Sequence, residues 1–382
     1  MSRPSLCMIH EGIGDFNAIA KVAMAGVEVA LKAGWNVSCI AKRLDAQLID
    51  RVTWHQLHVP GRVFLYKWLT ARHYIKKAMG DKLFDVVHAH QPQVADLSDI
   101  FQCHFLTRML LERHCTDQGD GPRGFFRGAQ ERAVVIAEGF QYRHWRPQTR
   151  MLFNSEGTRN DFTRLFGQPP LNDVLPCPMP RQNIADAAER RAAKESFFGS
   201  DCGLPVVGFL GGEIKRKGIQ RLLAAASVET GLRFLVGGSG SEIVEVPPKA
   251  AARCKQVGLI TDLDRFYAAC DVLLVCSFYE PLGLVAFESV ARGTPVIATP
   301  EVGALPHLLK HGIGARWQPG EPLLPIVRDI LARPERIPSA VDAMEAELGP
   351  EQYGRQLLEF YDRILKEKAH HAPQQRLVAE TV

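Results

Sequence analysis

Two carboxylates, Glu280 and Glu288, stand eight positions apart in the segment EPLGLVAFE. Glu280 follows an apolar run, and Glu288 is flanked by apolar residues in a predicted helix. Glutamates on a helix surface are commonly just solvated, whereas a charge on an otherwise apolar helix needs a partner or a ligand. The first carboxylate could accept hydrogen bonds from the hydroxyls of a sugar, and the second could hold a vicinal diol such as that of a ribose.

The elements around this segment are a strand, a loop, a helix and a second strand. Residues 271–276 (DVLLVC) predict a buried strand, and residues 296–299 (VIAT) predict the next one. In such a βαβ unit the ligand crevice lies at the carboxyl end of the strand. The N–H groups of Gly283, Leu284 and Val285 open the helix there without intrahelical partners, which suits a phosphate. Places for a sugar, a diphosphate and a ribose together predict an enzyme of nucleotide sugars.

A basic cluster follows a second glycine-rich strand end. The segment FLGGEIKRKGIQRLL (209–223) predicts a strand, a tight loop that begins at Gly211, a basic cluster and an amphipathic helix. Arg216 and Lys217 in this cluster could offset the charge that develops on a departing diphosphate, without a metal ion. An exposed basic turn is the usual explanation for a short Lys/Arg cluster. The position directly after a strand end favours the functional interpretation.

Both segments resemble one enzyme family. Residues 277–299 (SFYEPLGLVAFESVARGTPVIAT) closely resemble the signature of the large retaining glycosyltransferase family 4, whose members have the two-domain GT-B fold. Many members carry an arginine directly after the first glycine of the basic loop, where this chain has Gly212. The order Arg216, Lys217, Gly218 instead resembles the glucosyltransferases of the bacterial lipopolysaccharide core.

The resemblance implies a role for each candidate residue of the second half. Glu280 would orient the sugar hydroxyls, and Glu288 would hold the ribose. Arg216 and Lys217, with the N–H groups that open the helix, would hold the donor diphosphate and stabilise it as it leaves. The residues that would offer backbone groups to the nucleotide base are Gly258 and Leu259.

In the first half the resemblance implies a glycine-rich loop and a histidine near the transferred sugar. Gly12 and Gly14 fit the loop, because a side chain there would block close approach of the backbone. Their spacing is not a full G-x-G-x-x-G, so it gives little support to a dinucleotide site. We prefer His104 as the acceptor-side catalytic group. The lipopolysaccharide-core relatives favour an aspartate, matched here by Asp99, and a core histidine with satisfied hydrogen bonds is the third alternative.

The pair His88 and His90 shares one face of a predicted strand and looks like part of a metal site. No third ligand is evident nearby, and GT-B enzymes generally need no metal. We therefore predict no metal and no cofactor, with the nucleoside diphosphate sugar as co-substrate. Nine cysteines without a C-x-x-C pair predict reduced thiols rather than a disulfide frame or a zinc site.

Alternating apolar strands and helical patterns in both halves predict an α/β fold with two Rossmann-like, doubly wound domains. The resemblance adds that the domains face each other across a cleft and that a C-terminal helix crosses back to the first domain. We predict an N-terminal acceptor-binding domain, a C-terminal donor-binding domain, a returning helix and a disordered tail, at residues 1–176, 177–351, 352–369 and 370–382.

Composition and charge restrict the class of partner. The net charge is only +4, so bulk nucleic-acid binding is not indicated. No apolar run is long enough to span a membrane and no signal peptide is evident, so we predict a cytoplasmic protein. The basic, aromatic segment 61–80 could make a weak contact with an anionic membrane, at the inner face of the cytoplasmic membrane. A core-packed helix with a solvated basic face is the more common explanation.

These patterns and the resemblance together predict a glycosyltransferase that moves a sugar to a hydroxyl of a glycan or lipid-linked acceptor. The resemblance further implies that the enzyme retains the anomeric configuration and acts in lipopolysaccharide or other cell-surface polysaccharide synthesis. UDP-glucose is the first donor to test, ahead of UDP-galactose, UDP-GlcNAc and GDP-mannose. A nucleotide-sugar epimerase of GT-B fold and a non-catalytic nucleotide-sugar-binding subunit are the alternatives.

Overall fold

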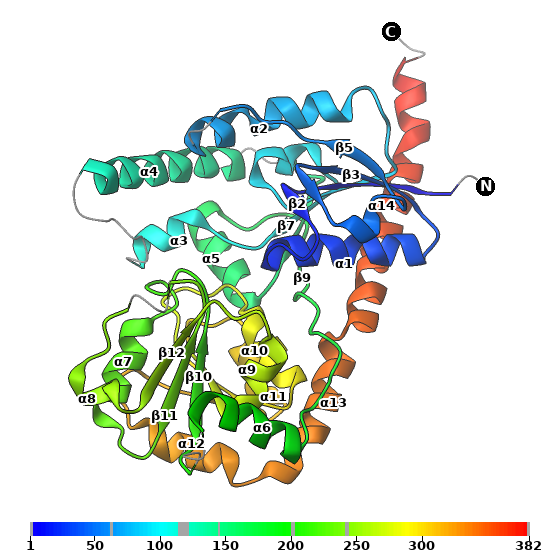
Figure 1. Cartoon of the computed structure of the whole chain (residues 1–382). Helices are drawn as coiled ribbons and strands as arrows, with labels where there is room; N and C mark the ends of the chain where they lie inside the picture. The colour runs from blue at the N-terminus through cyan, green and yellow to red at the C-terminus, as the bar shows by residue number, and fades with distance from the viewer. Residues whose placement is uncertain are drawn as a thin grey trace. The chain divides into compact units, whose positions relative to one another are not determined.

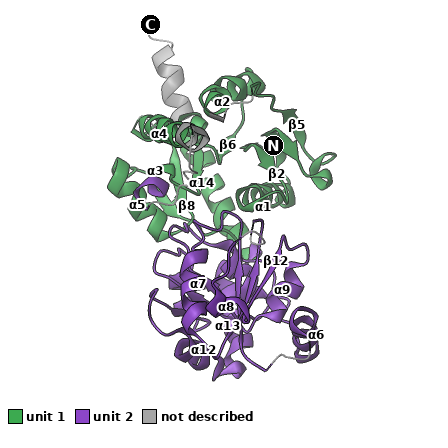
Figure 2. Cartoon of the chain, turned by 60° about the vertical axis from the view of Figure 1, so that its left-hand side comes forward, with its two compact units in different colours: residues 1–108, 118–178, 351–382 green, residues 109–117, 179–350 purple. Residues whose placement is uncertain are grey.

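The computed structural model describes residues 3–61, 64–113, 122–143, 146–199, 203–240 and 244–379. The chain forms two compact units (Figure 2). Unit 1 comprises residues 1–108, 118–178 and 351–382, and unit 2 comprises residues 109–117 and 179–350. The sequence prediction placed one boundary after residue 176 and did not anticipate that residues 109–117 group with unit 2.

Unit 1 is built on a parallel sheet of seven strands in the order β5-β3-β1-β6-β7-β8-β9. Its inner strands are short, mostly buried runs, as expected of a parallel sheet covered on both faces. The strands are β1 (Ser5–Ile9), β3 (Asn36–Ala41), β5 (Thr53–Gln56), β6 (Val86–Ala89), β7 (Ile100–Cys103), β8 (Arg150–Phe153) and β9 (Asn172–Val174). Two short strands, β2 (Gly12–Ile13) and β4 (Arg43–Leu44), follow β1 and β3 in the chain and pair with each other in a separate small sheet.

Helices connect the strands of unit 1, and α1 and α2 lie on opposite sides of the sheet (Figure 1). Helix α1 (Ala18–Lys32) begins where the side chain of Asn17 accepts a hydrogen bond from the N–H of Ala20, at 2.9 Å. The other helices are α2 (Phe64–Met79), α3 (Thr107–Glu112), which runs into unit 2, α4 (Pro122–Arg143), α5 (Glu156–Phe166) and α14 (Pro350–Ala379).

The C-terminal helix α14 packs on unit 1. The side chain of Tyr361 is fully buried, and its hydroxyl lies 2.9 Å from Nδ1 of His88. Lys368 donates to the carboxylate of Asp99 at 2.8 Å. The return of the terminal helix to the first domain is therefore confirmed.

The end of the chain differs from the prediction. We expected disorder from residue 370, but α14 continues to Ala379, and residues 380–382 lie outside the described residues. The prediction relied on the missing apolar pattern, which reports burial. The sequence after Pro373 consists mainly of good helix formers, and helix propensity does not depend on burial.

Unit 2 contains a parallel sheet of six strands in the order β12-β11-β10-β13-β14-β15. The strands predicted at residues 271–276 and 296–299 are confirmed as β13 (Val272–Val275) and β14 (Val296–Ala298). The others are β10 (Val206–Leu210), β11 (Arg233–Gly237), β12 (Cys254–Gly258) and β15 (Gly314–Arg316).

A core of aliphatic and aromatic side chains, Phe209, Phe234 and Trp317 among them, fills the space between this sheet and its helices. The helices are α6 (Ala187–Phe198), α7 (Ile219–Val228), α8 (Pro248–Ala251), α9 (Leu263–Ala269), α10 (Leu284–Ala291), α11 (Leu305–Lys310), α12 (Leu323–Leu331) and α13 (Ile337–Leu348). Among the described residues of both units, no helix is long and apolar enough to cross a membrane.

Candidate active site

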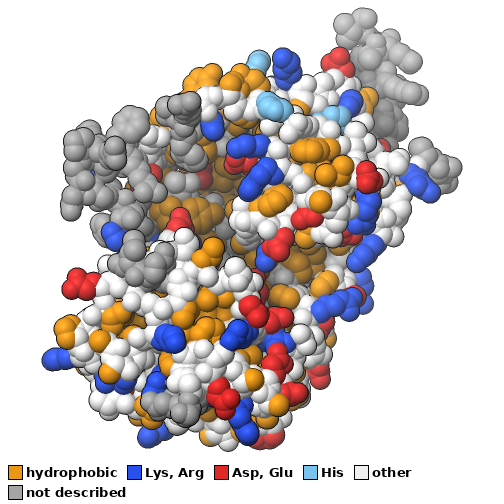
Figure 3. Space-filling model, in the orientation of Figure 1, with side chains coloured by type: hydrophobic (Ala, Val, Ile, Leu, Met, Phe, Trp, Pro, Cys, Tyr) orange, Lys and Arg blue, Asp and Glu red, His pale blue; other side chains and the backbone are white. Residues whose placement is uncertain are grey.

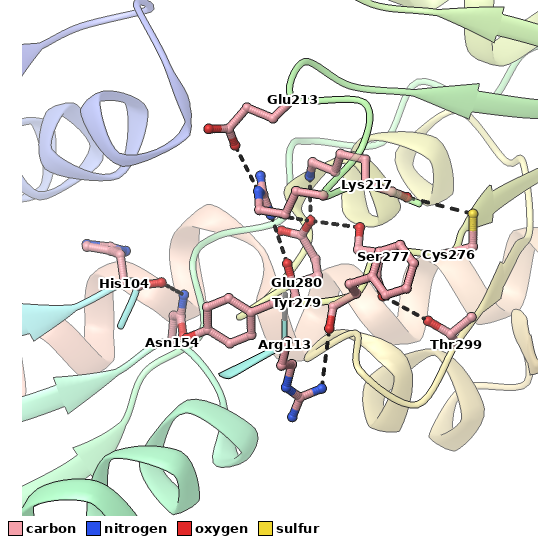
Figure 4. Close-up of polar contacts among 12 residues, drawn as sticks. His104, Arg113, Asn154, Glu213, Lys217, Cys276, Ser277, Tyr279, Glu280 and Thr299 are labelled. Carbon is pink, nitrogen blue, oxygen red and sulfur yellow. Dashed lines mark hydrogen bonds and ion pairs between the residues drawn. The ribbon is translucent and has the colours of Figure 1, made fainter. Parts of the chain in front are cut away.

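The carboxylate of Glu280 is the centre of a buried polar group at the carboxyl end of β13. Lys217 donates to its Oε2 through Nζ, and the hydroxyl of Ser277 donates to the same oxygen at 3.2 Å (Figure 4). Nη1 of Arg216 lies 3.6 Å from that oxygen. Glu280 is only 8% exposed. The structure thus brings together the three charged residues that two separate sequence segments predicted.

These contacts set the charge of the group. Burial by itself would raise the pKa of the Glu280 carboxyl, but the charges of Lys217 and Arg216 and the hydrogen bonds outweigh burial and leave its pKa below the ordinary value. Glu280 is therefore ionised at neutral pH. A second carboxylate, that of Glu213, pairs with Arg216 at 2.8 Å but is 73% exposed. In the buried part of the group two cations therefore face one carboxylate, which leaves an excess positive charge that an anionic ligand can use.

The basic loop and the loop after β13 hold each other in place. Nη1 of Arg216 donates to the carbonyl of Tyr279 at 2.8 Å, and the carbonyl of Arg216 accepts from the N–H of Phe278 at 2.9 Å. Gly218 lies between them with φ 83°, and a Cβ there would come within 2.0 Å of the Cys276 carbonyl oxygen. Only glycine allows the two loops this approach.

Gly218→Ala is expected to destabilise the protein by several kcal/mol, because it adds a backbone clash to the cost of about 1–2 kcal/mol for a left-handed alanine. Gly199→Ala is the matched control, since Gly199 has φ 66° and a Cβ there would meet no atom within 4 Å. Urea unfolding of the two variants measures the difference. Equal losses of stability would show that the close approach has no energetic weight.

Arg221 is a positioning residue that the sequence analysis missed. Its guanidinium lies 3.9 Å above the ring of Phe278 and donates to the carbonyls of Cys276 and Ser277, at 3.2 and 3.1 Å. It also lies 3.4 Å from the carboxylate of Glu301. Arg221 therefore fixes the loop that carries Glu280. No local spacing marks it, because its partners lie far along the chain.

Helix α10 opens beside Glu280. Its N-cap is Gly283, with φ 96°, and a Cβ there would lie 3.2 Å from Cγ of Glu280. The cap makes no side-chain hydrogen bond, so the N–H groups of Leu284 and Val285 are oriented outward from the first turn, as at any helix start. These groups and the two cations of the basic loop could hold the oxygens of a diphosphate.

Glu288 lies on α10, one helical turn beyond the opening, and is half-buried. The hydroxyl of Tyr267 donates to its Oε2 at 2.8 Å. Burial and the nearby carboxylate of Glu288 raise the pKa of Tyr267 well above its ordinary value, so the phenol keeps its proton. Tyr267 thus orients the carboxylate that the sequence analysis assigned to a ribose, and sequence spacing gave no sign of this partner.

Three other candidates of unit 2, Gly211, Gly258 and Leu259, lie at the carboxyl ends of β10 and β12. The N–H of Gly211 donates to the carbonyl of Gly237 at 3.2 Å, and a Cβ on Gly211 would lie 3.1 Å from Cγ of Lys217. The carbonyl of Gly258 accepts from Gly238 at 2.7 Å, whereas Leu259 is 72% exposed. Gly211 therefore makes room for Lys217, and the Gly258 carbonyl already has a partner.

In unit 1 four buried histidines form a row. The rings of His90 and His104 stack at 5.1 Å, with Nδ1 of His90 2.8 Å from Nε2 of His104, and His88 stacks on His90 at 4.6 Å. His10 meets His90 edge to face and donates through Nδ1 to the carbonyl of Gly12. The row links His104 to the predicted glycine loop, where a Cβ on Gly14 would lie 2.7 Å from Cβ of Asp45.

Burial keeps the row uncharged. It lowers the pKa of both His88 and His104 to about 3, and that of His90 well below its ordinary value. His104 is therefore a neutral imidazole at neutral pH. Among the described residues, no group of three His, Cys, Asp or Glu side chains is placed to hold a metal ion.

Asp99 does not share the position of His104. It precedes β7, at the opposite end of that strand, and accepts from the N–H of Val87 and from Lys368, each at 2.8 Å. These contacts bind β6 and α14 to β7. The structure therefore separates the two acceptor-side candidates by the length of a strand.

The part of the chain that contains the site is similar to a known protein family. Residues 204–343 match the family described as glycosyl transferases group 1. This part of the chain is therefore similar to a glycosyl transferases group 1 domain. It contains Glu280, Glu288, Arg216 and Lys217.

Two curated relatives of the chain are glycosyltransferases by name. The D-inositol 3-phosphate glycosyltransferases of Mycobacterium bovis and Mycobacterium tuberculosis are 26% identical to the chain over 254 residues, which cover 60% of the chain and 50% of those proteins. The chain thus spans about half the length of the curated relatives it matches.

Three solved structures share the fold at low identity. Sucrose-phosphate synthase from Thermosynechococcus elongatus is 18% identical, with a TM-score of 0.75 over 96% of this chain and 100% of that one. The glycosyltransferase WaaG of lipopolysaccharide biosynthesis is 14% identical, with a TM-score of 0.70 over 92% and 99%. Anabaena HepE in complex with UDP-glucose is 14% identical, with a TM-score of 0.67 over 94% and 99%. Units 1 and 2 are thus the two Rossmann-like domains of a GT-B fold.

Proposed function

We propose that the protein is a retaining glycosyltransferase that moves a sugar from a nucleoside diphosphate donor to a hydroxyl of a glycan or lipid-linked acceptor. UDP-glucose is the first donor to test, since HepE was solved with UDP-glucose. Lipopolysaccharide or another cell-surface polysaccharide is the proposed product, in line with the biosynthetic role named for WaaG. The observation that carries the proposal is the buried group of Glu280, Lys217 and Arg216 beside the opening of α10.

This group suits the cleavage of a bond to a diphosphate. The bond between the anomeric carbon and a diphosphate oxygen breaks, and negative charge grows on the departing oxygens. Lys217, Arg216 and the N–H groups that open α10 lie in fixed positions to stabilise that charge, without the help of a metal ion. Glu280 accepts hydrogen bonds from the sugar hydroxyls, and Glu288 accepts hydrogen bonds from the ribose hydroxyls. The acceptor hydroxyl oxygen bonds to the anomeric carbon on the face that the diphosphate leaves, and its proton passes to the departing diphosphate oxygen.

Incubation with labelled UDP-glucose and a set of glycan acceptors tests the proposal directly. A glycosylated acceptor with the donor's anomeric configuration, formed equally in EDTA, is the expected product. An epimerised donor would identify a nucleotide-sugar epimerase, and a bound but unchanged donor would identify a binding subunit. A strict requirement for a divalent metal would contradict the role given to the two cations.

Glu288→Ala is expected to weaken the binding of UDP about tenfold, which corresponds to roughly 1.4 kcal/mol, because a charged acceptor for the ribose hydroxyls is lost. Tyr267→Phe is the matched control, since it keeps the carboxylate and removes only the hydroxyl that orients it. We expect this control to change the UDP affinity by less than about threefold. Calorimetric titration measures both, and unchanged UDP affinity in Glu288→Ala would place the ribose elsewhere.

Helix α2 supports a weak contact with an anionic membrane. Tyr66 and Leu69 are 48% and 56% exposed, and apolar side chains lie on the surface over this helix (Figure 3). Lys76 and Lys77 near its end are exposed as well. Residues 62 and 63 of the predicted segment lie outside the described residues. We propose a cytoplasmic enzyme that meets its acceptor at the inner leaflet, consistent with the seven described cysteines, which are all free thiols.

Sedimentation with anionic vesicles is expected to show binding that fades as salt rises, because each exposed lysine contributes about 1 kcal/mol near such a surface. The double variant Lys76→Ala, Lys77→Ala should reduce the bound fraction at low salt. Neutral vesicles are the control. Equal binding to both vesicle types, or none at low salt, would leave α2 without a membrane role.

A further inference from the structure

A cavity in unit 1 opens at the carboxyl ends of neighbouring strands. Glu11 follows β1, Lys42 follows β3 and Gln91 follows β6, while α2 closes one side. The chain order of the sheet reverses between β1 and β6, and ligands of doubly wound folds bind at such a point. The cavity volume is about 110 Å³. In the liquid one water takes about 30 Å³, so the cavity has room for about four waters, which suits one edge of a sugar ring and its substituents.

Two residues of its wall, Gln91 and Gln93, have buried side-chain oxygens without a donor among the described residues. Gln93 is 6% exposed, and among the described residues neither its Oε1 nor that of Gln91 has a hydrogen-bond partner. A buried acceptor left unpaired costs about 1–3 kcal/mol. The backbone of Gln93 is held by Arg72, which donates to its carbonyl at 3.2 Å and to the carboxylate of Asp96 at 2.7 Å. Both oxygens are covered by protein atoms, so each side chain must turn toward the cavity before a sugar hydroxyl can donate to it, and the gain of a donor favours that turn.

The charges in the wall favour an anion. Nζ of Lys42 lies 3.7 Å from the carboxylate of Glu11, whereas Lys67 has no carboxylate partner within the described part of the chain. Lys67 is half-buried on α2 and precedes Trp68, which also lines the cavity. An indole offers an apolar surface to the C–H face of a sugar, with a polar N–H at its edge. The wall thus combines a cation, an aromatic face and acceptors for hydroxyls.

We infer that this cavity binds one acidic sugar unit of the acceptor, a ring that carries a phosphate or a carboxylate. Its anionic group pairs with Lys67, its hydroxyls donate to the amides of Gln93 and Gln91, and its apolar face lies against Trp68. The inference rests on the proposed function and adds the acceptor's chemical class, which is anionic.

Binding of four small probes by ligand-observed NMR tests the inference: glucose 6-phosphate, glucuronate, glucose and inorganic phosphate. We expect glucose 6-phosphate or glucuronate to bind about tenfold more tightly than both glucose and inorganic phosphate. Whichever of these two acidic sugars binds more tightly shows whether the cavity prefers a phosphate or a carboxylate. The inference would be overturned if glucose bound as tightly as both acidic sugars. If inorganic phosphate bound as tightly as the acidic sugars, the cavity would be a simple anion site and the inference would be wrong.

Variants of the wall supply the control. Lys67→Ala should weaken the acidic sugars to the level of glucose, while Lys76→Ala, an exposed lysine on the same helix, should leave them unchanged. Lys42→Ala is a second wall variant, and thermal unfolding checks that each variant is folded. Acidic-sugar binding that survives in both wall variants contradicts the inference.

The same samples separate this inference from the proposed function. UDP binding should be equal in wild type and Lys67→Ala, because the donor residues belong to unit 2. An acidic sugar that binds through Lys67 in a protein that transfers no sugar would count against the proposed function alone. Transfer with acidic-sugar binding insensitive to Lys67 would count against the acceptor site alone.

Discussion

Glu280→Gln is expected to lower kcat by roughly a hundredfold or more, about 3 kcal/mol of barrier, while the Kd for UDP stays within about threefold of the wild-type value. The substitution keeps the shape of the side chain but removes the charge that Lys217 and Arg216 hold in place. An amide still fits the site, but it has no charge to pair with the two cations. It also accepts hydrogen bonds from the sugar hydroxyls less well than a carboxylate does. Saturating-donor kinetics and UDP titration measure the two effects separately.

Glu213→Gln is the matched control for Glu280→Gln. Glu213 also accepts from Arg216, at 2.8 Å, but its side chain is 73% exposed. An exposed ion pair contributes little, so kcat should change by less than about threefold. Full turnover in Glu280→Gln, or an equal loss in both variants, would remove the buried carboxylate from the mechanism.

Lys217→Ala is the second substitution with a large expected effect. It should slow transfer at saturating donor by roughly a hundredfold, because a cation that stabilises the departing diphosphate is lost. It should also raise the pKa of Glu280, since Lys217 is the largest charge that holds that pKa down. A carboxylate with a higher pKa is protonated earlier as pH falls. The acid limb of the kcat profile should therefore move to higher pH.

Two further variants make the Lys217 result interpretable. Lys215→Ala removes an exposed lysine two positions away and should leave kcat within about threefold. The double variant Lys217→Ala, Glu280→Gln should lose less than the sum of the two single losses, because the residues contact each other. Additive losses and an unmoved acid limb would mean that the two side chains act independently.

The fold was predictable from the sequence wherever burial leaves a pattern. The inner strands, such as β6, β10 and β13, are continuous buried runs, and the sequence predicted them. The sequence did not predict the outermost strands of the two sheets, which are β5, β9, β12 and β15. Their residues are half-buried or exposed. An edge strand pairs on one side only and is less covered, so its composition does not distinguish it from a loop.

The candidate site was predictable in part for a similar reason. Glu280 and Lys217 stand out because charged residues there interrupt apolar or glycine-rich segments. Arg221 and Tyr267 do not stand out, since their roles arise from contacts with residues more than twenty positions away. Asp99 was a candidate by resemblance, and its contacts with Val87 and Lys368 became visible only in three dimensions.

The position of α14 has a consequence for how the chain is made. Tyr353 and Tyr361 of this helix are buried in unit 1, beside groups such as His88 and Trp35 that are synthesised much earlier. At 5–20 residues per second, roughly ten to forty seconds separate residue 178 from the end of α14. Unit 2 lies between them and can be completed first. The nascent unit 1 therefore keeps an open apolar groove on the ribosome until the last helix emerges, and a chaperone has its best opportunity to bind there.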